Sequence, residues 1–280
     1  MTYREAVNYG SQMLAMADIA ESKTDAWLLL EMACRIDRSF YYLHMEEELP
    51  EEQFSEYEIA LKKRAEHVPL QYITGETEFM GLKFRVNSGV LIPRQDTETL
   101  VEEVLKAVKP GMRVLDLCTG SGCVIVSILH NAENIEGFAT DISRQALNVA
   151  KENARLNETS VIFERSDLFD HVTGTFDMIV SNPPYIPTGE LVKLMPEVHL
   201  FEPEEALDGK EDGLYFYRRI IAECGDYLKP GGMIFFEIGY DQGEAVSEML
   251  RSAGFLMVQV TKDLSRLDRV VSGRMPEGEP

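Results

Sequence analysis

The amino-acid sequence predicts an α/β protein in which a small all-α bundle precedes a mostly parallel, doubly wound sheet. Three observations carry this prediction. Apolar residues recur at helical spacing in the first part of the chain, strand and helix patterns alternate after residue 93, and only a few polar residues separate the last two strand patterns. Such a short connection permits an antiparallel pair but no crossover, so we expect the last strand to be antiparallel.

Residues 1–75 are predicted to be helical. Trp27, Leu30 and Cys34 repeat at helical spacing, and we expect Thr24 and Asp25 to cap this helix. A second helix is expected after Pro50, where one face carries the apolar residues Phe54, Tyr57, Leu61, Ala65 and Val68. We therefore assign residues 1–75 to a helical bundle.

Residues 76–92 are rich in β-formers and interrupted by glycine, and we expect a β-hairpin linker there. In the rest of the chain, residues 93–280, strands are expected at 113–117, 137–140, 161–164, 177–180, 233–238, 255–260 and 269–271. The expected helices are 124–129, 143–156, 213–227 and 244–253. This alternation is typical of a Rossmann-like sheet, which binds ligands at the carboxyl ends of its strands.

Composition limits the classes of function. The chain has 280 residues, a hydrophobic fraction of 45% and a net charge of −21. This charge opposes binding to a phosphate backbone, although a local basic groove would be compatible with it. No apolar run has the length of a membrane helix, and the first residues lack the pattern of a signal peptide. The four cysteines form no C-x-x-C pair, so we expect no zinc site, no disulfides and a cytoplasmic protein.

A glycine turn, Cys118-Thr119-Gly120-Ser121-Gly122, joins the strand at 113–117 to its helix. Glycines let the backbone turn tightly and approach a ligand, and the helix amino end offers unpaired N–H groups. Asp141 follows Gly120 by 21 positions, at the end of the next strand. A carboxylate at that place can accept both hydroxyl groups of a ribose.

Several interpretations of this turn compete. The dinucleotide fingerprint fails because Ile125 stands at its last small position, and no Gly-Lys-Ser/Thr follows to complete a phosphate loop. The remaining pattern, D-x-x-x-G-x-G, resembles the cofactor loop of S-adenosylmethionine-dependent methyltransferases, although an ordinary βα turn is also compatible. Cys118 stands where that loop often has glycine, and we expect it to keep a negative φ. No base in the motif supports Cys118 as a nucleophile.

Asn182-Pro183-Pro184-Tyr185 ends the strand at 177–180. An amide or ring amino nitrogen is a poor nucleophile, and two acceptors that bind both of its hydrogens would align it with a methyl donor. The Asn182 side-chain oxygen can be one acceptor, and a backbone carbonyl at Pro183 can be the other. Tyr185 offers an aromatic face to a planar group. A simple strand-terminating turn is the alternative.

Nine segments together resemble the HemK/PrmC-type release factor glutamine methyltransferases, which belong to the class I methyltransferases. These segments are residues 69–75, 91–98, 182–186, 202–203, 206–207, 212–214, 217–218, 228–232 and 237–239. The resemblance implies methylation of the side-chain amide of the glutamine in the Gly-Gly-Gln motif of class 1 bacterial peptide release factors. The cofactor would be S-adenosylmethionine, with S-adenosylhomocysteine as the product and no metal. It further implies substrate recognition by residues 1–75 and a cytoplasmic monomer that binds neither membranes nor nucleic acid directly.

The resemblance also implies the site. Asn182, Pro183, Pro184 and Tyr185 would grip the glutamine amide and carry catalysis. The cofactor-binding residues would be Thr97, Glu98, Cys118, Thr119, Gly120, Ser121, Gly122, Asp141, Asp167, Leu168 and Asn182. Leu168 stands at the adenine side, where relatives often have an aromatic residue, and Asp167 can bond the adenine amino group.

Some roles stay open. Thr97 and Glu98 can approach the methionine end of the cofactor or form a helix N-cap with a favourable acid. Arg94 can meet a ligand or join the two domains, and Glu237 fits a catalytic or a structural role.

Alternatives of other classes also remain. The same chemistry would suit a glutamine of a ribosomal protein or an adenine in nucleic acid. The chain could also be a non-catalytic cofactor-binding translation module, against which the intact Asn182-Pro183-Pro184-Tyr185 motif argues.

Overall fold

The computed structural model describes residues 1–277, and the chain folds into two compact units. One unit contains residues 1–75 together with Met195–Phe201, and the other contains Glu76–Leu194 and the chain from Glu202 onward. The first unit therefore includes a short segment that is remote in sequence. Among residues 1–277, none of the helices combines the length and the apolar character that crossing a bilayer requires.

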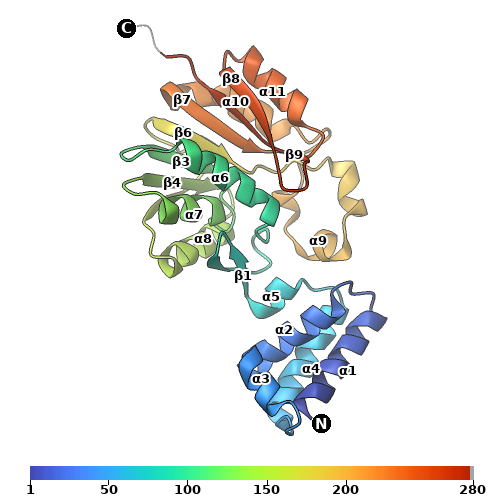
Figure 1. The fold of residues 1–280 in the computed structure, drawn as a ribbon. Helices are drawn as coiled ribbons and strands as arrows, with labels where there is room; N and C mark the ends of the chain where they lie inside the picture. The colour runs from blue at the N-terminus through green and yellow to red at the C-terminus, as the bar shows by residue number, and fades with distance from the viewer. Residues whose placement is uncertain (278–280) are drawn as a thin grey trace. The chain divides into compact units, whose positions relative to one another are not determined.

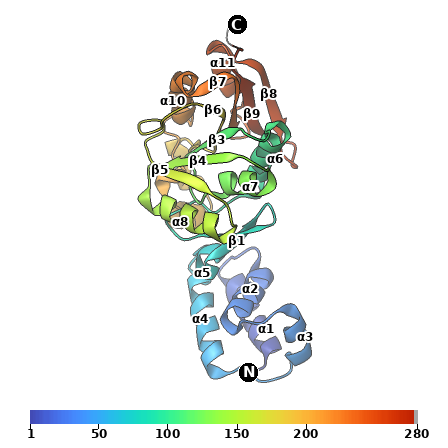
Figure 2. The same ribbon diagram turned by 90° about the vertical axis from the view of Figure 1, so that its left-hand side faces the viewer.

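The first unit is made of helices, as its apolar spacing predicts. They are α1 (Tyr3–Met16), α2 (Ser22–Cys34), α3 (Arg38–His44), α4 (Glu51–Ala65), α5 (Leu70–Thr74) and α9 (Pro196–Phe201). Tyr57 and Leu61 of α4 are fully buried, and the Tyr57 hydroxyl donates to the Ala26 carbonyl at 3.0 Å. Gly10 of α1 lets α4 approach closely, since a Cβ there would lie 2.0 Å from the Tyr57 hydroxyl. Figure 2 shows α1, α2 and α4 packed side by side.

The expected cap of the second helix is wrong. α2 begins at Ser22, so Thr24 and Asp25 lie inside its first turns, and no side chain caps it. The Asp25 carboxylate instead accepts from Arg64 Nε at 2.7 Å, and both side chains are buried. Arg64 also contacts Glu197 of α9 at 3.1 Å, within the same unit. A buried carboxylate needs a partner of opposite charge, and this requirement decides the role of Asp25.

The second unit contains a hairpin and a seven-stranded sheet (Figure 1). The hairpin strands are β1 (Glu76–Phe79) and β2 (Leu82–Arg85). The sheet strands are β3 (Arg113–Leu117), β4 (Glu136–Asp141), β5 (Val161–Arg165), β6 (Phe176–Ser181), β7 (Leu228–Glu237), β8 (Leu256–Lys262) and β9 (Asp268–Arg274). Their order is β5-β4-β3-β6-β7-β9-β8, with β9 antiparallel to both neighbours and the other pairs parallel. The predicted fold class is confirmed.

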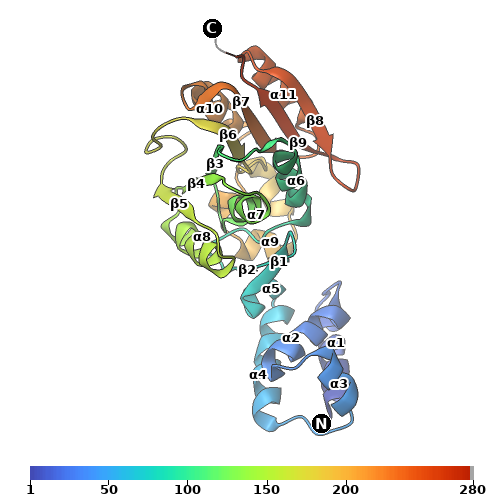
Figure 3. The ribbon, with the colours of Figure 1, turned by 60° about the vertical axis from the view of Figure 1, so that its left-hand side comes forward.

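Helices cover both faces of this sheet. One face carries α6 (Glu98–Ala107), α7 (Cys123–Asn131) and α8 (Arg144–Leu156), and the other carries α10 (Tyr215–Glu223) and α11 (Gly243–Ser252). Figure 3 shows the two groups from the side. Short 3-10 turns complete the unit at η1 (Gln95–Thr97), η2 (Thr188–Lys193), η3 (Glu204–Ala206) and η4 (Cys224–Asp226). The helix expected at 213–227 is shorter at both ends, because Gly213 has a φ of +73° before it and the 3-10 turn η4 follows it.

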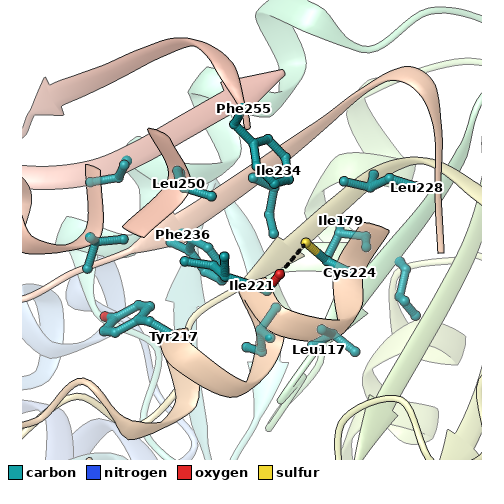
Figure 4. Close-up of a cluster of buried hydrophobic side chains, with 14 of the residues drawn as sticks. Leu117, Ile179, Tyr217, Ile221, Cys224, Leu228, Ile234, Phe236, Leu250 and Phe255 are labelled. Atoms are coloured by element: carbon teal, nitrogen blue, oxygen red, sulfur yellow. Dashed lines mark hydrogen bonds between the residues drawn. The ribbon is translucent and has the colours of Figure 1, made fainter. Parts of the chain in front are cut away.

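Alternate residues of the central strands enter two different cores. On β7, Ile234 and Phe236 face α10 and α11, whereas Phe235 between them faces the other layer. Figure 4 shows the core on the α10 and α11 side, where Cys224 Sγ donates to the Ile221 carbonyl. Burial on both faces explains why these strands are continuously apolar. It also fixes the strand ends, so the loops after β3, β4 and β6 meet at one edge.

Candidate active site

A cavity of about 370 Å³ lies at the carboxyl ends of β3, β4 and β6. Gly120, Asp141 and Asn182, from three different loops, all line it. Its volume is in the range of small-molecule sites. The residues singled out in the sequence that line the cavity are Thr97, Cys118, Thr119, Gly120, Ser121, Asp141, Asp167, Leu168, Asn182 and Pro184. Those that do not line it are Glu98, Gly122, Pro183 and Tyr185.

The turn after β3 is built from left-handed backbone. Cys118, Gly120 and Gly122 have φ values of +59°, +54° and +80°, so the expectation of a negative φ at Cys118 is wrong. The turn is closed by the Thr119 N–H, which donates to the Thr140 carbonyl at 3.0 Å. A non-glycine residue in this region costs about 1 kcal/mol. The chain accepts that cost at Cys118.

Asp141 braces the same turn from the next strand. Its Oδ2 accepts from the Gly120 N–H at 2.9 Å, and its Oδ1 accepts from the Ser143 N–H at 2.8 Å. Burial raises the pKa of this carboxyl group, and the two backbone N–H groups act in the opposite direction. Each carboxylate oxygen has a further lone pair, so the side chain can brace the loop and still accept hydroxyl groups of a ligand.

Asp116 is a site residue that the sequence analysis did not single out. It is the acid of the D-x-x-x-G-x-G pattern, lines the cavity, and is only 1% exposed. Its Oδ2 accepts from the Thr119 hydroxyl at 2.6 Å. Burial raises the pKa of Asp116 to about 7, against the opposing effect of this hydrogen bond. Its position as the acid of that pattern could have identified it from the sequence.

Asp167 and Leu168 form another part of the cavity wall. Asp167 Oδ1 accepts from Arg219 Nη1 at 2.9 Å, and the Arg219 guanidinium lies 5.7 Å from the centre of the Tyr215 ring. Leu168 is buried and has a φ of +50°. Arg219 and Tyr215, which the sequence did not single out, also line the cavity. This wall combines an apolar surface with a carboxylate that is held in place.

Asn182 lies opposite Thr97. Its Nδ2 donates to the Thr97 hydroxyl at 3.5 Å, and within residues 1–277 no hydrogen bond engages the Asn182 Oδ1, which can therefore act as an acceptor. Thr97 is the N-cap residue of α6 and Glu98 is the acid of its first turn, as the alternative expects, but the Thr97 side chain makes no capping hydrogen bond. Glu98 lies away from the cavity, because its Oε1 accepts from the Met80 N–H at 2.7 Å. Thr97 is thus the member of this pair that approaches the site.

The loop of Asn182 is held by two side chains that are not among those lining the cavity. The Tyr185 hydroxyl donates to Glu237 Oε1 at 3.4 Å, and Gln242 Nε2 donates to the Tyr185 carbonyl at 2.9 Å. Burial raises the pKa of the Tyr185 hydroxyl well above its usual value. Gly213 allows this packing, since a Cβ on it would lie 2.3 Å from the Tyr185 carbonyl oxygen. The sequence analysis missed Gln242.

Arg94 also lines the cavity, and it pairs with Glu202 at 2.5 Å. Both residues belong to the second unit, so this ion pair joins two segments of that unit. Among residues 1–277, no group of three or more His, Cys, Asp or Glu side chains is placed to hold a metal ion.

Family models match both parts of the chain, and relatives match most of its length. Residues 5–75 match the model described as PrmC N-terminal domain, and residues 93–198 match the methyltransferase small domain. The release factor glutamine methyltransferase of Clostridium acetobutylicum is 44% identical over 254 residues, covering 88% of this chain and 89% of the relative. That of Cereibacter sphaeroides is 42% identical and covers 99% of both chains.

The chain belongs to the release factor glutamine methyltransferase family. The resemblance inferred from the sequence is therefore confirmed, and the protein is a methyltransferase. Among solved structures, a methyltransferase from Pyrococcus furiosus superimposes with a TM-score of 0.55 and 19% identity, over 71% of this chain and 91% of that one. At this identity the likeness shows the fold alone.

Proposed function

We propose that this protein uses S-adenosylmethionine to methylate the side-chain amide nitrogen of the glutamine in the Gly-Gly-Gln motif of class 1 bacterial release factors. The observation that carries the proposal is the shared cavity. In this member of the family, one cavity is lined by Asn182, which suits an amide nucleophile, and by Gly120 and Asp141, which suit a nucleoside. S-adenosylhomocysteine would be the second product.

The cavity residues fit the proposed cofactor. S-adenosylmethionine supplies an electrophilic methyl group when it is bound. Asp141 is placed to accept the ribose hydroxyls, and the left-handed backbone at Gly120 leaves room for close approach. Leu168 offers the adenine an apolar surface, and Asp167 beside it is an acceptor for the adenine amino group. These assignments use only groups that the structure brings together at one strand edge.

Asn182 would hold the glutamine amide. Delocalisation makes an amide nitrogen a weak nucleophile, so its two hydrogens must be bound by acceptors that align the nitrogen with the methyl group. The free Asn182 Oδ1 is one acceptor, and we assign the second role to a backbone carbonyl at Pro183. No strong base is required, because the methylated cation loses its proton readily. The Tyr185 hydroxyl is engaged with Glu237, which leaves the ring face as its proposed contact with the substrate.

The proposal extends to partners and place of action. We infer that residues 1–75 recognise the release factor and that the enzyme acts in the cytoplasm as a monomer. A net charge of −21 disfavours nucleic acid as the acceptor, because phosphate groups would be repelled. A ribosomal protein glutamine would suit the same chemistry, and only an acceptor assay separates the two.

An acceptor assay tests the proposal. Methyl-labelled S-adenosylmethionine is offered with the purified protein to a class 1 release factor, to ribosomal proteins and to DNA, and the label is mapped by mass spectrometry. We expect label on the glutamine of the Gly-Gly-Gln motif alone. A release factor with that glutamine changed to alanine is the control, and label on it, on a ribosomal protein or on DNA would refute the assignment.

A further inference from the structure

Two adjacent arginines of α10 have different surroundings. Arg219 lines the cavity, as does Tyr215, which precedes it by four positions and so lies on the same face of the helix. Arg218 does not line the cavity and instead forms a bidentate ion pair with Asp212, with distances of 2.8 and 2.9 Å. Of these two arginines, Arg219 is therefore the one that can act on a ligand in the cavity.

Arg219 holds the carboxylate of Asp167 by one of its oxygens. Its Nη1 donates to Asp167 Oδ1 at 2.9 Å, and within residues 1–277 no other hydrogen bond engages this carboxylate. Asp167 itself lines the cavity, and its second oxygen, Oδ2, keeps its lone pairs for a ligand. The pair thus offers the cavity a carboxylate with one oxygen bound and one oxygen able to accept.

Both ends of this pair are restrained. The guanidinium carbon of Arg219 lies 5.7 Å from the centre of the Tyr215 ring, which is within the range of a cation–π contact. The Tyr215 ring in turn meets the Phe216 ring edge-on, with 5.1 Å between their centres. At the other end of the pair, Leu168 follows Asp167, is buried, and has a φ of +50°, which restricts the backbone beside the carboxylate.

Stability does not account for this ion pair. The side chains of Arg219 and Asp167 are 28% and 40% exposed, and an ion pair with such access to water contributes little to the free energy of unfolding. Orientation is its larger consequence. An aspartate side chain without a partner populates several rotamers, and the hydrogen bond from Arg219 to Oδ1 selects among them.

We propose that Arg219 is a positioning residue of the cofactor site, which fixes Asp167 so that Oδ2 accepts from the exocyclic amino group of adenine. This inference rests on the proposed cofactor and on the assignment of Asp167 to its adenine. Hypoxanthine has a carbonyl oxygen in place of that amino group, and a carboxylate, which only accepts, repels it. A site that binds an N–H group of its ligand strongly rejects an analogue without that group. Arg219 thereby sets the selectivity for the base.

Calorimetry with two ligands tests this inference. They are S-adenosylhomocysteine and S-inosylhomocysteine, which carries hypoxanthine in place of adenine. We expect the wild type to bind the adenine ligand at least about tenfold more tightly, as for one hydrogen bond to a charged group. Arg219→Met keeps the length of the side chain without its donors and should reduce this preference to about threefold or less. Arg219→Lys, which keeps a charged donor, should retain more of the preference.

Arg218→Met is the matched control, because it removes an ion pair of the same helix whose members do not line the cavity. Its preference for the adenine ligand should equal that of the wild type. Asp167→Ala should lose the preference, and Arg219→Met should cause no further loss in the double variant, since both act on one contact. Thermal midpoints establish that each variant is folded.

Several results would overturn the inference. Equal loss of affinity for both ligands in Arg219→Met would assign Arg219 a packing role. An equal fall in preference in Arg218→Met, or a wild type that does not distinguish the ligands, would also refute it. A preference that survives in Asp167→Ala would show that Asp167 does not meet the adenine.

The proposed function is tested separately. The two-ligand measurement uses no methyl acceptor, so a failure to methylate release factors would refute the proposed acceptor while the selectivity for the base is still measured. If S-adenosylhomocysteine does not bind to the wild type, both the proposed cofactor and the role of Arg219 are refuted.

Discussion

The loop after β3 and the loop after β6 reach the same cavity but are held in different ways. The first is shaped by its own backbone, with positive φ at Cys118, Gly120 and Gly122. In the second, Pro183 and Pro184 have no backbone N–H to donate, and side chains from other segments hold the loop. Thr97 is 85 positions away from Asn182, and Gln242 is 57 positions away from Tyr185.

The difference shows how locally each part of the site is encoded. The left-handed turn depends on the backbone conformations of a few adjacent residues, so substitutions within the turn should affect its function most. A proline-rich loop has few backbone donors of its own and depends on partners from distant strands. The predictions below use this contrast, beginning with the largest expected effect.

Asn182→Ala tests the residue of the second loop that is proposed to bind the substrate amide. Removing one preorganised acceptor is expected to lower kcat by roughly 100-fold or more. Binding of S-adenosylmethionine, followed by calorimetry, should survive because the first loop is intact. Turnover equal to that of the wild type would disprove the proposed grip on the substrate amide.

Gly213→Ala tests the support beneath the second loop. A Cβ would lie 2.3 Å from the Tyr185 carbonyl oxygen, and the φ of +73° adds strain. We expect a loss of roughly 2 kcal/mol in unfolding free energy and a lower kcat. Gly189→Ala is the control, since nothing lies within 4 Å of its Cβ position and its φ lies outside the left-handed region. Equal denaturation midpoints for the two variants would contradict this packing.

Glu237→Gln tests the buried acid through pH. Burial raises the pKa of Glu237 from 4.5 to about 7, with Arg269, Asp96 and Tyr185 as its charged or titratable neighbours. Its stabilising contribution is therefore complete below about pH 4.5 and is lost as pH rises through about 7. The variant does not ionise, so its stability relative to the wild type should rise by roughly 3 kcal/mol between these limits. Urea titrations across this range would refute the idea if the difference stayed constant.

Asp141→Ala tests the brace of the first loop. The side chain accepts from the Gly120 and Ser143 N–H groups, so its loss removes both a loop support and the proposed ribose acceptor. We expect the Kd of S-adenosylhomocysteine to rise about tenfold or somewhat less, in keeping with one or two hydrogen bonds. Asp141→Asn keeps one acceptor oxygen, so its Kd should lie between those of the wild type and Asp141→Ala. Calorimetry that finds wild-type affinity in both would exclude this role.

Cys118→Gly is expected to have the smallest effect, and in the opposite direction. Glycine has no steric penalty at a φ of +59°, so the substitution should remove backbone strain of about 1 kcal/mol. The larger backbone entropy of the unfolded glycine variant offsets part of this gain in stability. We expect a slightly higher thermal midpoint with unaltered kcat. Cys118→Ala, which keeps a Cβ, is the control. If its thermal midpoint rose as much as that of Cys118→Gly, relief of backbone strain would be excluded as the cause.

Much of the second unit could be read from the sequence, because its strands are continuously apolar and its helices have a clear period. The strand expected at 113–117 has the bounds of β3 (Arg113–Leu117). Boundaries failed where tertiary contacts compete with local preference. Asp25 sits within a helix as the partner of Arg64 instead of capping it, and Gly213 shortens the helix expected at 213–227.

For the site, the sequence by itself determined which groups are candidates for the chemistry. The glycine turn and the strand-ending Asn-Pro-Pro-Tyr are both short motifs of adjacent residues, so they can be recognised from the sequence alone. Only the tertiary structure decided that Thr97 and Glu237 approach the Asn182 loop, that Glu98 turns to Met80, and that Gln242 holds the Tyr185 carbonyl. The physical reason is that a hydrogen bond needs a donor and an acceptor within about 3.5 Å, a condition that packing sets and spacing along the chain does not.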